Sequence, residues 1–244
     1  MPQADQQGYL LLLQQALAAV SPIALAGQSV VHVDRSPQVQ AAMVMVRTQA
    51  GGWHWLAATA VSTGKTGTFE YFLTPLRVFP HTLDNPDYRV KGSFNKNHIR
   101  GYGIRGRRVF DFGWQLAERG WGGGGNSKMR LQMHATDPRV LEPRLGLVAS
   151  EGCIRIQATV NVFLDIHGVL DADYEAAVAH GEKLWVLKAS RQTLPWLGRN
   201  MLIVDSQVTE RPLGSPLPTT PAAKPGPPAP GPAHANPLAL SALR

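Results

Sequence analysis

The sequence predicts a mainly β domain with one or two short helices near residues 155–180. Six segments are short and rich in Val, Met, Trp and Thr, and many are bounded by Gly, Pro or Asn, which is typical of strands. They are residues 28–33, 41–47, 53–62, 129–134, 183–188 and 200–205. The best helical patterns lie at residues 160–170 and 172–180, of which the second follows Asp171 and ends before Gly181.

The chain of 244 residues divides into three parts. Residues 1–26 are either an export signal or an N-terminal helix. They end in a small-x-small pattern at Ala24-Leu25-Ala26, but residues 1–8 carry no Lys or Arg. Residues 27–211 form the working domain, because 44% hydrophobic and 17% charged residues overall indicate a globular protein. Residues 212–244 are expected to be a disordered tail, since ten of the nineteen prolines lie between Pro212 and Pro237.

The net charge and the cysteine count limit the partners and the kinds of site that the protein can have. The net charge of +7 fits a polyanionic partner, either a nucleic acid or a bacterial envelope, and does not choose between them. The lone Cys153 excludes an intramolecular disulfide and a zinc site built on paired cysteines. No metal site is expected from the scattered histidines. No integral membrane segment is expected either, because Gln14 and Gln15 interrupt the longest apolar stretch at the front of the chain.

Three nucleotide-site patterns fail in their sequence context. Gly64-Lys65-Thr66 lacks the glycine of a phosphate loop, because Thr59 stands five places before Gly64. Residues 101–106 match Gly-x-Gly-x-x-Gly, but residues 107–112 then alternate like a strand instead of opening a helix. Asp111-Phe112-Gly113 lacks a kinase catalytic loop before it.

The segment around the only cysteine carries the strongest chemical signal. Gly152 lets the backbone turn sharply before Cys153, leaving amide hydrogens free to face a developing oxyanion. Arg155 shares a strand face with Cys153, where its charge lowers the thiol pKa or binds a carboxylate. His134 ends a predicted strand nineteen residues upstream, a spacing that allows a strand, a loop and a return. Cys153 and His134 are therefore predicted to act as nucleophile and general base.

These residues also form a family-like pattern. The chain contains His134-Ala135-Thr136 and, after the fifteen residues 135–149, Ser150-Glu151-Gly152-Cys153-Ile154-Arg155. This arrangement resembles the signature of the L,D-transpeptidase (YkuD-type) catalytic domain. In that signature a histidine, usually followed by Gly-Thr, is separated by a spacer of similar length from the sequence Ser/Thr-His-Gly-Cys-apolar-Asn/Arg. Residues 61–65 and 74–79 are similar to the family's Ser-x-Gly-Lys segment and Thr-Pro hairpin, and residues 181–187 to its closing strand. The resemblance spans residues 44–205 and implies the family's β-sandwich or mixed-sheet fold.

Two positions depart from the family pattern. Ala135 stands where glycine is usual, and Glu151 replaces the histidine two places before Cys153. On an extended segment, the Glu151 carboxylate faces the same side as the thiol and raises its pKa, unless it pairs with Arg155 or is protonated.

The resemblance implies a mechanism on peptidoglycan stem tetrapeptides. The Cys153 thiolate, prepared by His134, attacks the carbonyl of the third stem residue, amides around Gly152 bind the oxyanion, and D-alanine leaves. The thioester then passes to an amine or to water. Four further residues are expected to contact the substrate: Arg155, Ser150, Glu151 and Trp121, the last with a glycine loop at residues 122–125. No cofactor is needed, and the place of action is the periplasm or cell envelope.

Alternative functions stay open at this stage. A hydrolase of the same family, an L,D-carboxypeptidase or an amidase that releases wall proteins, shares the thioester and differs in the acceptor. The second hypothesis is a non-catalytic domain that binds peptidoglycan. In that case Glu151, in place of the family's histidine, indicates that the catalytic site has been lost. A nucleic-acid-binding β domain is the third hypothesis and rests on basic and aromatic residues: Arg105, Arg107, Arg108, Phe110 and Phe112. The sequence leaves the oligomeric state and the acyl acceptor open.

Overall fold

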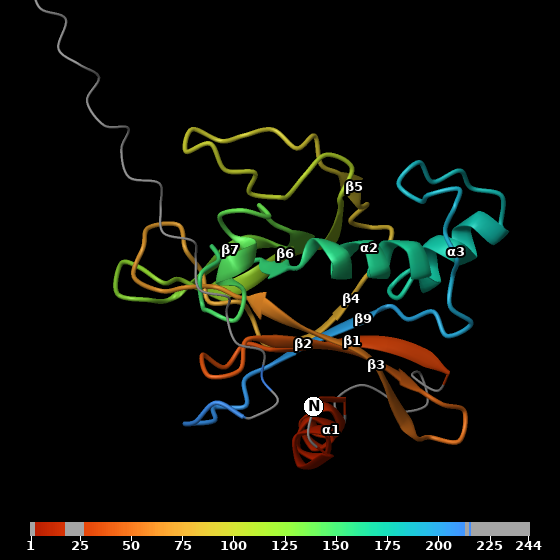
Figure 1. The fold of residues 1–244 in the computed structure, drawn as a ribbon, viewed down its shortest axis with the longest axis horizontal. Coiled ribbons are helices and arrows are strands. Elements are labelled where there is room, and N and C mark those ends of the chain that lie inside the picture. Colours follow the sequence, from red (N-terminus) through yellow and green to blue (C-terminus); the bar gives the residue numbers. More distant parts are fainter. Residues whose placement is uncertain (1–2, 18–26, 213–214, 216–244) are drawn as a thin grey trace, which may run out of the picture.

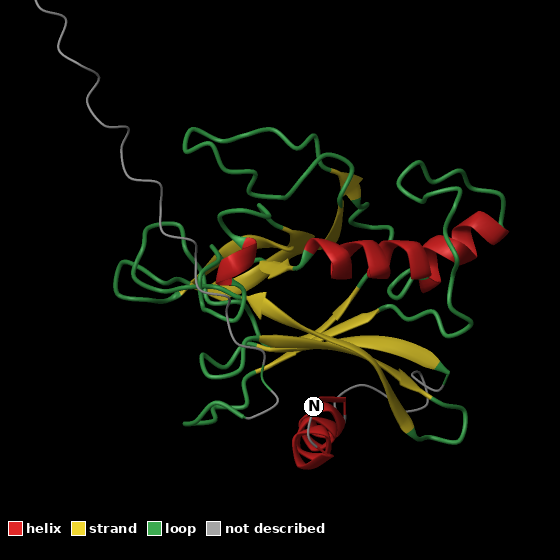
Figure 2. Cartoon of the chain, viewed as in Figure 1, coloured by secondary structure: helices red, strands yellow, loops and turns green. Residues whose placement is uncertain are grey.

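A computed structural model describes residues 3–17, 27–212 and 215, and within them a curled, nine-stranded mixed sheet with three α-helices (Figures 1 and 2). The strands are β1 (Gln28–Asp34), β2 (Ala41–Arg47), β3 (Trp53–Ser62), β4 (Arg77–Pro80), β5 (Tyr88–Arg89), β6 (Arg108–Glu118), β7 (Asn126–Ala135), β8 (Ile154–Ile156) and β9 (Asn200–Val204). The helices are α1 (Gln3–Leu17), α2 (Ala158–His167) and α3 (Ala172–Ala179), with a 3₁₀ turn, η2, at Glu142–Arg144. The strand order is β4-β9-β1-β2-β3-β8-β7-β6-β5.

The predicted mainly β class is confirmed, with five of the six strands present. The prediction of a strand at residues 183–188 is wrong, and so is the closing strand implied at residues 181–187, because turns occupy this segment. Side-chain contacts, rather than strand pairing, fix the position of residues 183–188. The Arg89 guanidinium donates to the Val186 carbonyl, and Lys188 Nζ lies 3.0 Å from the Asp165 carboxylate on α2.

Both helices predicted near residues 155–180 are present, but the first ends earlier than expected. Gly168 adopts a left-handed φ of 60° and ends α2. Val169 and Leu170, which extended the apolar pattern in the sequence, are fully buried in the turn between α2 and α3. α3 begins after Asp171 as predicted, although the Asp171 side chain does not cap it.

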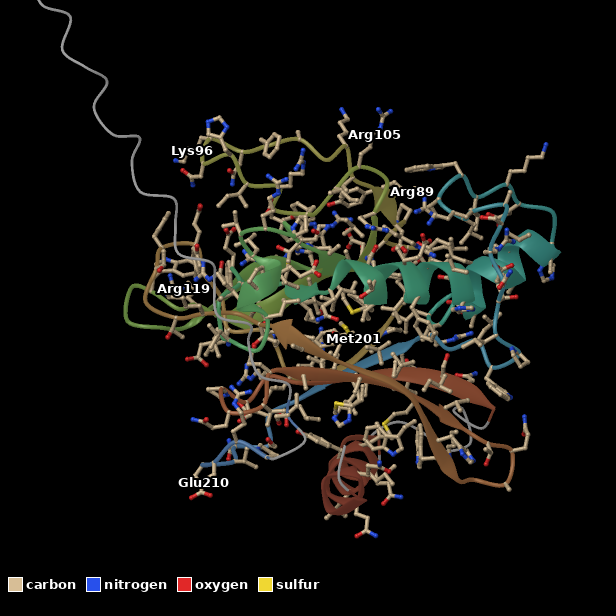
Figure 3. The ribbon with its side chains drawn as sticks, in the orientation of Figure 1. Arg89, Lys96, Arg105, Arg119, Met201 and Glu210 are labelled. Atoms are coloured by element: carbon tan, nitrogen blue, oxygen red, sulfur yellow. The ribbon has the colours of Figure 1, made fainter. Side chains whose placement is uncertain are left out.

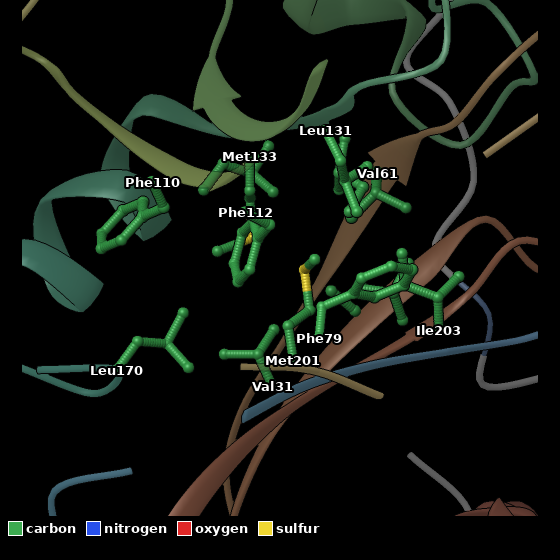
Figure 4. Packing of buried hydrophobic residues seen from close by; sticks show 14 of the residues in the cluster. Val31, Val61, Phe79, Phe110, Phe112, Leu131, Met133, Leu170, Met201 and Ile203 are labelled. Atoms are coloured by element: carbon green, nitrogen blue, oxygen red, sulfur yellow. The ribbon is translucent and has the colours of Figure 1, made fainter. Parts of the chain in front are cut away.

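The main core lies between the two halves of the curled sheet. β3 belongs to both halves: it pairs with β2 on one side and with β8 on the other. Figure 4 shows residues of both halves packed together. They include Val31 and Met201 from one half, and Phe110, Phe112, Leu131 and Met133 from the other, all buried. This packing fixes the positions of β6, β7 and β8 relative to the rest of the sheet.

α1 covers the outer face of the half of the sheet that contains β1, β2 and β9 (Figure 1). Its Tyr9 and Leu13 are buried against a second apolar cluster that includes Val30, Met43 and Leu202. Residues 18–26 with their small-x-small pattern, and nearly all of the proline-rich segment 212–244, lie outside the described residues. Among the helices that the structure describes, none is long and apolar enough to cross a bilayer.

A buried ion cluster joins β6 to the helices. Arg108 has no exposed surface, and its Nε lies 2.6 Å from Asp87 while its Nη1 lies 2.8 Å from Asp171 at the start of α3. His81 Nε2 lies 2.8 Å from the same Asp87 carboxylate. Burial disfavours a charged imidazole, but the Asp87 charge outweighs it and raises the pKa of His81 above its usual value. The charges therefore compensate one another away from water.

We expect Leu13→Ala to lower the free energy of unfolding by about 2–4 kcal/mol, because Leu13 is fully buried between α1 and the sheet. Leu11→Ala on the same helix is the matched control: Leu11 is 57% exposed, so its change is within about 0.5 kcal/mol. Urea unfolding of the full chain measures both. Equal stability of the two variants would mean that α1 does not pack on the sheet.

Arg108→Ala is expected to lower the free energy of unfolding by about 3–5 kcal/mol, because it leaves the buried Asp87 and Asp171 carboxylates without their cation. Arg105→Ala, at an exposed position three residues earlier, changes it by no more than about 0.5 kcal/mol. Urea unfolding compares the two, and a small loss for Arg108→Ala would show that the cluster contributes little.

Candidate active site

The register between β7 and β8 brings the predicted nucleophile and base together. The two strands run parallel, with Met133 opposite Ile154 and His134 opposite Arg155. Met133 and Ile154 point into the core. Because side chains alternate along a strand, Cys153, Arg155 and His134 all belong to the opposite face. The register places His134 on the strand beside β8, which Cys153 directly precedes; direct contact between thiol and imidazole stays a prediction.

The cysteine loop is held by both of the more distant motif segments. The Ser150 N–H donates to the Thr63 carbonyl and the Lys65 N–H to the Ser150 carbonyl, at 2.9 and 3.0 Å. The Thr74 hydroxyl accepts the Gly64 N–H and donates to the Gly152 carbonyl, each at 2.8 Å. Residues 61–65, 74–79 and 150–155, far apart in sequence, therefore meet at one point.

Ser150 shapes the loop from inside. It is fully buried, and its hydroxyl donates to the Cys153 carbonyl at 2.5 Å and accepts the Gly152 N–H at 3.1 Å. Ser150 therefore fixes the backbone of the Cys153 loop, whereas the sequence suggested that it contacts substrate. The Gly152 N–H, expected to face an oxyanion, is occupied by this bond in the present conformation.

Gly152 is required by the backbone and by its neighbours. Its φ of +130° lies where residues with a side chain rarely go. A Cβ there would also lie 2.9 Å from the Met129 sulfur and 3.1 Å from the Phe72 Cβ. The close turn before Cys153 that the sequence suggested is therefore present.

His134 is buried and oriented as a neutral base. Its Nδ1 lies 2.6 Å from the Ala135 carbonyl oxygen, which only accepts, so Nδ1 carries the proton and Nε2 the free lone pair. The ring of Tyr102 lies beside it, with 4.3 Å between the centroids. Burial, with a smaller contribution from the Arg155 charge, lowers the pKa of His134 to about 4.

The Cys153 thiol is half-buried and protonated at neutral pH. It lies 3.5 Å from the Arg130 carbonyl oxygen and also near the Gln132 backbone N–H, both on β7. Burial raises its pKa to about 11, and Glu151 adds to this; Arg155 and the Gln132 backbone N–H act in the opposite direction. The expected effect of Arg155 on the thiol is present, but burial outweighs it.

Glu151 faces a cavity instead of Arg155. The carboxylate is exposed and has no ion-pair partner within 4 Å among the described residues, whereas Arg155 Nη1 donates to the Ala149 carbonyl at 2.9 Å. The Glu151–Arg155 ion pair, one of the two arrangements that would have shielded the thiol from this carboxylate, is therefore not formed. The cavity measures about 570 Å³ and opens between β5 and the loop that follows it. Its lining includes Tyr88, Lys91, Phe94, Ile99, Tyr102 and Glu151.

Three residues of the site were missed by sequence reasoning. The Tyr102 hydroxyl donates to Gln132 Oε1 at 3.1 Å, and Gln132 Nε2 donates to the Asp111 carboxylate at 2.8 Å. The sequence feature that could have revealed Tyr102 is the set of glycines in residues 101–106, which resembles a nucleotide-binding motif. Gly103 has a φ of +85°, and a Cβ there would lie 3.1 Å from the Ala135 Cβ. The glycine therefore lets this loop approach His134.

Trp121 lies on the other side of the cysteine loop. It packs edge-on against Phe69 and Phe72, with centroids 5.6 and 4.8 Å apart, and does not line the cavity described above. Phe72 in turn lies against Gly152. The glycines at residues 122–125 form the turn of the β6–β7 hairpin, all with positive φ.

The surface expected for nucleic-acid binding is not formed by the predicted residues. Arg108 belongs to the buried ion cluster, and Phe110 and Phe112 lie in the core. Among the described residues, no group of three or more His, Cys, Asp or Glu is placed to hold a metal ion. Neither a family model nor a curated protein matches the chain.

Because burial raises the pKa of Cys153 to about 11, its alkylation by iodoacetamide should accelerate by about tenfold per pH unit between roughly pH 7 and 10. The chain has one cysteine, so mass spectrometry of the intact protein reports on Cys153 alone. A rate that is already constant near pH 7 would show that the thiol is ionised there.

Glu151→Gln should speed this alkylation about two- to fivefold at pH 8, since it removes a charge that opposes the thiolate. Glu182→Gln, at an exposed position beyond α3, is the matched control and leaves the rate unchanged. Equal rates for the two variants would mean that the Glu151 charge does not reach the thiol.

Proposed function

We propose that the chain is a cysteine-dependent L,D-transpeptidase that acts on peptidoglycan stem tetrapeptides. The observation that carries this proposal is the convergence of three motif segments, residues 61–65, 74–79 and 150–155, on the Cys153 loop beside His134. Each segment resembled the family separately, and their contacts support one common site. The mainly β mixed sheet is compatible with the family's fold.

The first half-reaction forms a thioester. The Cys153 thiol turns from the Arg130 carbonyl toward His134, gives its proton to Nε2, and sulfur attacks the carbonyl carbon of the third stem residue. Thiol and imidazole are both neutral beforehand, so proton transfer accompanies the attack. The C–N bond then breaks, and the leaving D-alanine amine takes the proton from His134.

The oxyanion of the tetrahedral intermediate needs N–H donors. The Gly152 N–H can serve once it exchanges Ser150 Oγ for the substrate oxygen, a weak bond to lose at 3.1 Å. Thr74 keeps the Gly152 carbonyl fixed during this exchange through its bond of 2.8 Å. The loop thus keeps its shape while one donor changes partner.

Charged groups on either side of Cys153 fit a stem with a diamino acid in third position. Arg155 shares the strand face of the thiol and offers a cation to a stem carboxylate. Glu151 offers an unpaired carboxylate on the cavity wall to the side-chain ammonium. In this mechanism Trp121 acts through Phe72 and the cysteine loop.

In the second half-reaction an amine attacks the thioester, forms the new amide and releases the Cys153 thiol. If water attacks instead, the product is a trimmed tripeptide and the protein is a hydrolase of the same family. Because the substrate lies outside the cytoplasmic membrane, the proposal places the protein in the periplasm or cell envelope.

The test is mass-spectrometric analysis of purified disaccharide-tetrapeptide after incubation with the full chain. We expect dimers that lack one D-alanine, and a loss of at least about 10³-fold for Cys153→Ser. His134→Gln should lose about 10²- to 10⁴-fold, whereas His54→Gln, at an exposed position on β3, keeps full activity.

Other products decide between the alternatives. Tripeptide alone identifies the hydrolase. Unchanged substrate, together with binding to peptidoglycan that survives in Cys153→Ser, identifies a non-catalytic wall-binding domain and rejects the transpeptidase.

A further inference from the structure

The positive charge of the chain is concentrated in one surface loop. Residues 88–107 contain six Lys and Arg and no Asp or Glu, while the whole chain has a net charge of +7. This segment comprises β5 and the loop to β6, and projects on the side of the molecule opposite α1 (Figure 1). Figure 3 shows Lys96 and Arg105 at its outer edge. This loop is therefore a strongly basic part of the surface.

Its outermost cations are free to bind a partner. Lys91, Lys96 and Arg105 are exposed, and no carboxylate of the described residues lies within 4 Å of their charged nitrogens. This contrasts with Arg89 in the same segment, which pairs with Asp165 at 2.9 Å. The exposed cations therefore have no structural role in the fold that would explain their presence.

Exposed apolar side chains lie among these cations. Phe94, Tyr102 and Ile104 are 53%, 41% and 40% exposed. Trp185 is 71% exposed, and its neighbour Val186 accepts a hydrogen bond from Arg89 at the base of the loop. A soluble polyanion without aromatic groups would be bound by the cations alone, whereas cations interleaved with exposed aromatic and aliphatic side chains fit an interface between lipid headgroups and acyl chains.

The loop is held in a fixed shape. Val90 and the returning residues 106–107 exchange two backbone hydrogen bonds of 2.9 Å. The Arg100 N–H donates to the Asp137 carboxylate at 3.0 Å, and its guanidinium lies 3.8 Å from the centre of the Phe94 ring. The surface is thus present before any partner binds, which reduces the entropy lost on docking.

We propose that residues 91–105, with Trp185, form a docking surface for an anionic lipid membrane. Lys91, Lys96 and Arg105 contact the acidic headgroups, and Phe94, Ile104 and Trp185 enter the interface beside them. This inference does not rest on the chemistry at Cys153, although Lys91 and Phe94 also line the cavity that Glu151 faces. It describes how the folded domain associates with a membrane surface.

Co-sedimentation of the full chain with vesicles tests the proposal. We expect binding to phosphatidylcholine vesicles that contain roughly one third phosphatidylglycerol, weak binding to phosphatidylcholine alone, and loss of binding at high salt. The triple variant Lys91→Ala, Lys96→Ala, Arg105→Ala should bind at least about tenfold more weakly. A control with the same loss of charge, Lys128→Ala, Arg139→Ala, Arg144→Ala, removes exposed cations outside residues 91–105 and the Trp185 segment and should lose much less.

The apolar contribution separates a membrane from other polyanions. Phe94→Ser and Trp185→Ser should each weaken vesicle binding about threefold or more, without changing binding to inorganic polyphosphate, a soluble polyanion that has no ring or acyl chain to contact them. Unchanged vesicle binding in both variants overturns the proposal, and so does equal weakening by the loop triple and its control. Circular dichroism confirms that each variant is folded.

Discussion

The fold depends on a guanidinium that is wholly removed from water. Arg108 holds Asp87 and Asp171 at 2.6 and 2.8 Å, and so ties β6 to the residues before β5 and to the start of α3. Burying such charges is costly unless every one of them is paired, so the three elements must meet in one geometry. The sequence predicts Asp171 as the residue at which α3 begins. Its carboxylate, however, accepts hydrogen bonds from Arg108, so α3 begins without a side-chain cap.

This cluster reaches the candidate site through one strand. Asp111 follows Arg108 by three residues on β6, and its N–H donates to the Asp87 carboxylate at 2.9 Å. The Asp111 carboxylate in turn receives Arg130 Nε and Gln132 Nε2, both at 2.8 Å, from the stretch of β7 against which the Cys153 thiol lies. The position of the thiol is therefore connected by hydrogen bonds to the most buried charge of the molecule.

The pattern of side chains predicts the sheet better than it predicts the connections. β2 and β3 have the predicted bounds because their buried and half-buried residues give a clear apolar signal. Residues 183–188 carry a similar signal, yet they form turns because Arg89 and Asp165 bind them, and no local pattern contains those partners. Likewise, the 19-residue spacing of His134 and Cys153 indicates their proximity, but the rotation of the thiol toward Arg130 depends on packing from β7.

The candidate site also shows why local motifs need their surroundings. The sequence predicts that Glu151 raises the thiol pKa unless it pairs with Arg155 or is protonated, whereas the structure also places it on the wall of a cavity. Arg155 is engaged by the Ala149 carbonyl, and Glu151 stands at the cavity wall below the basic loop that contains Lys91 and Tyr102. A carboxylate there opposes the thiolate from two residues away, while burial already keeps the thiol neutral. In the proposed mechanism, a thiol that stays protonated until His134 accepts its proton reacts less with other electrophiles. The burial of Cys153 and the Glu151 charge both favour that protonated thiol.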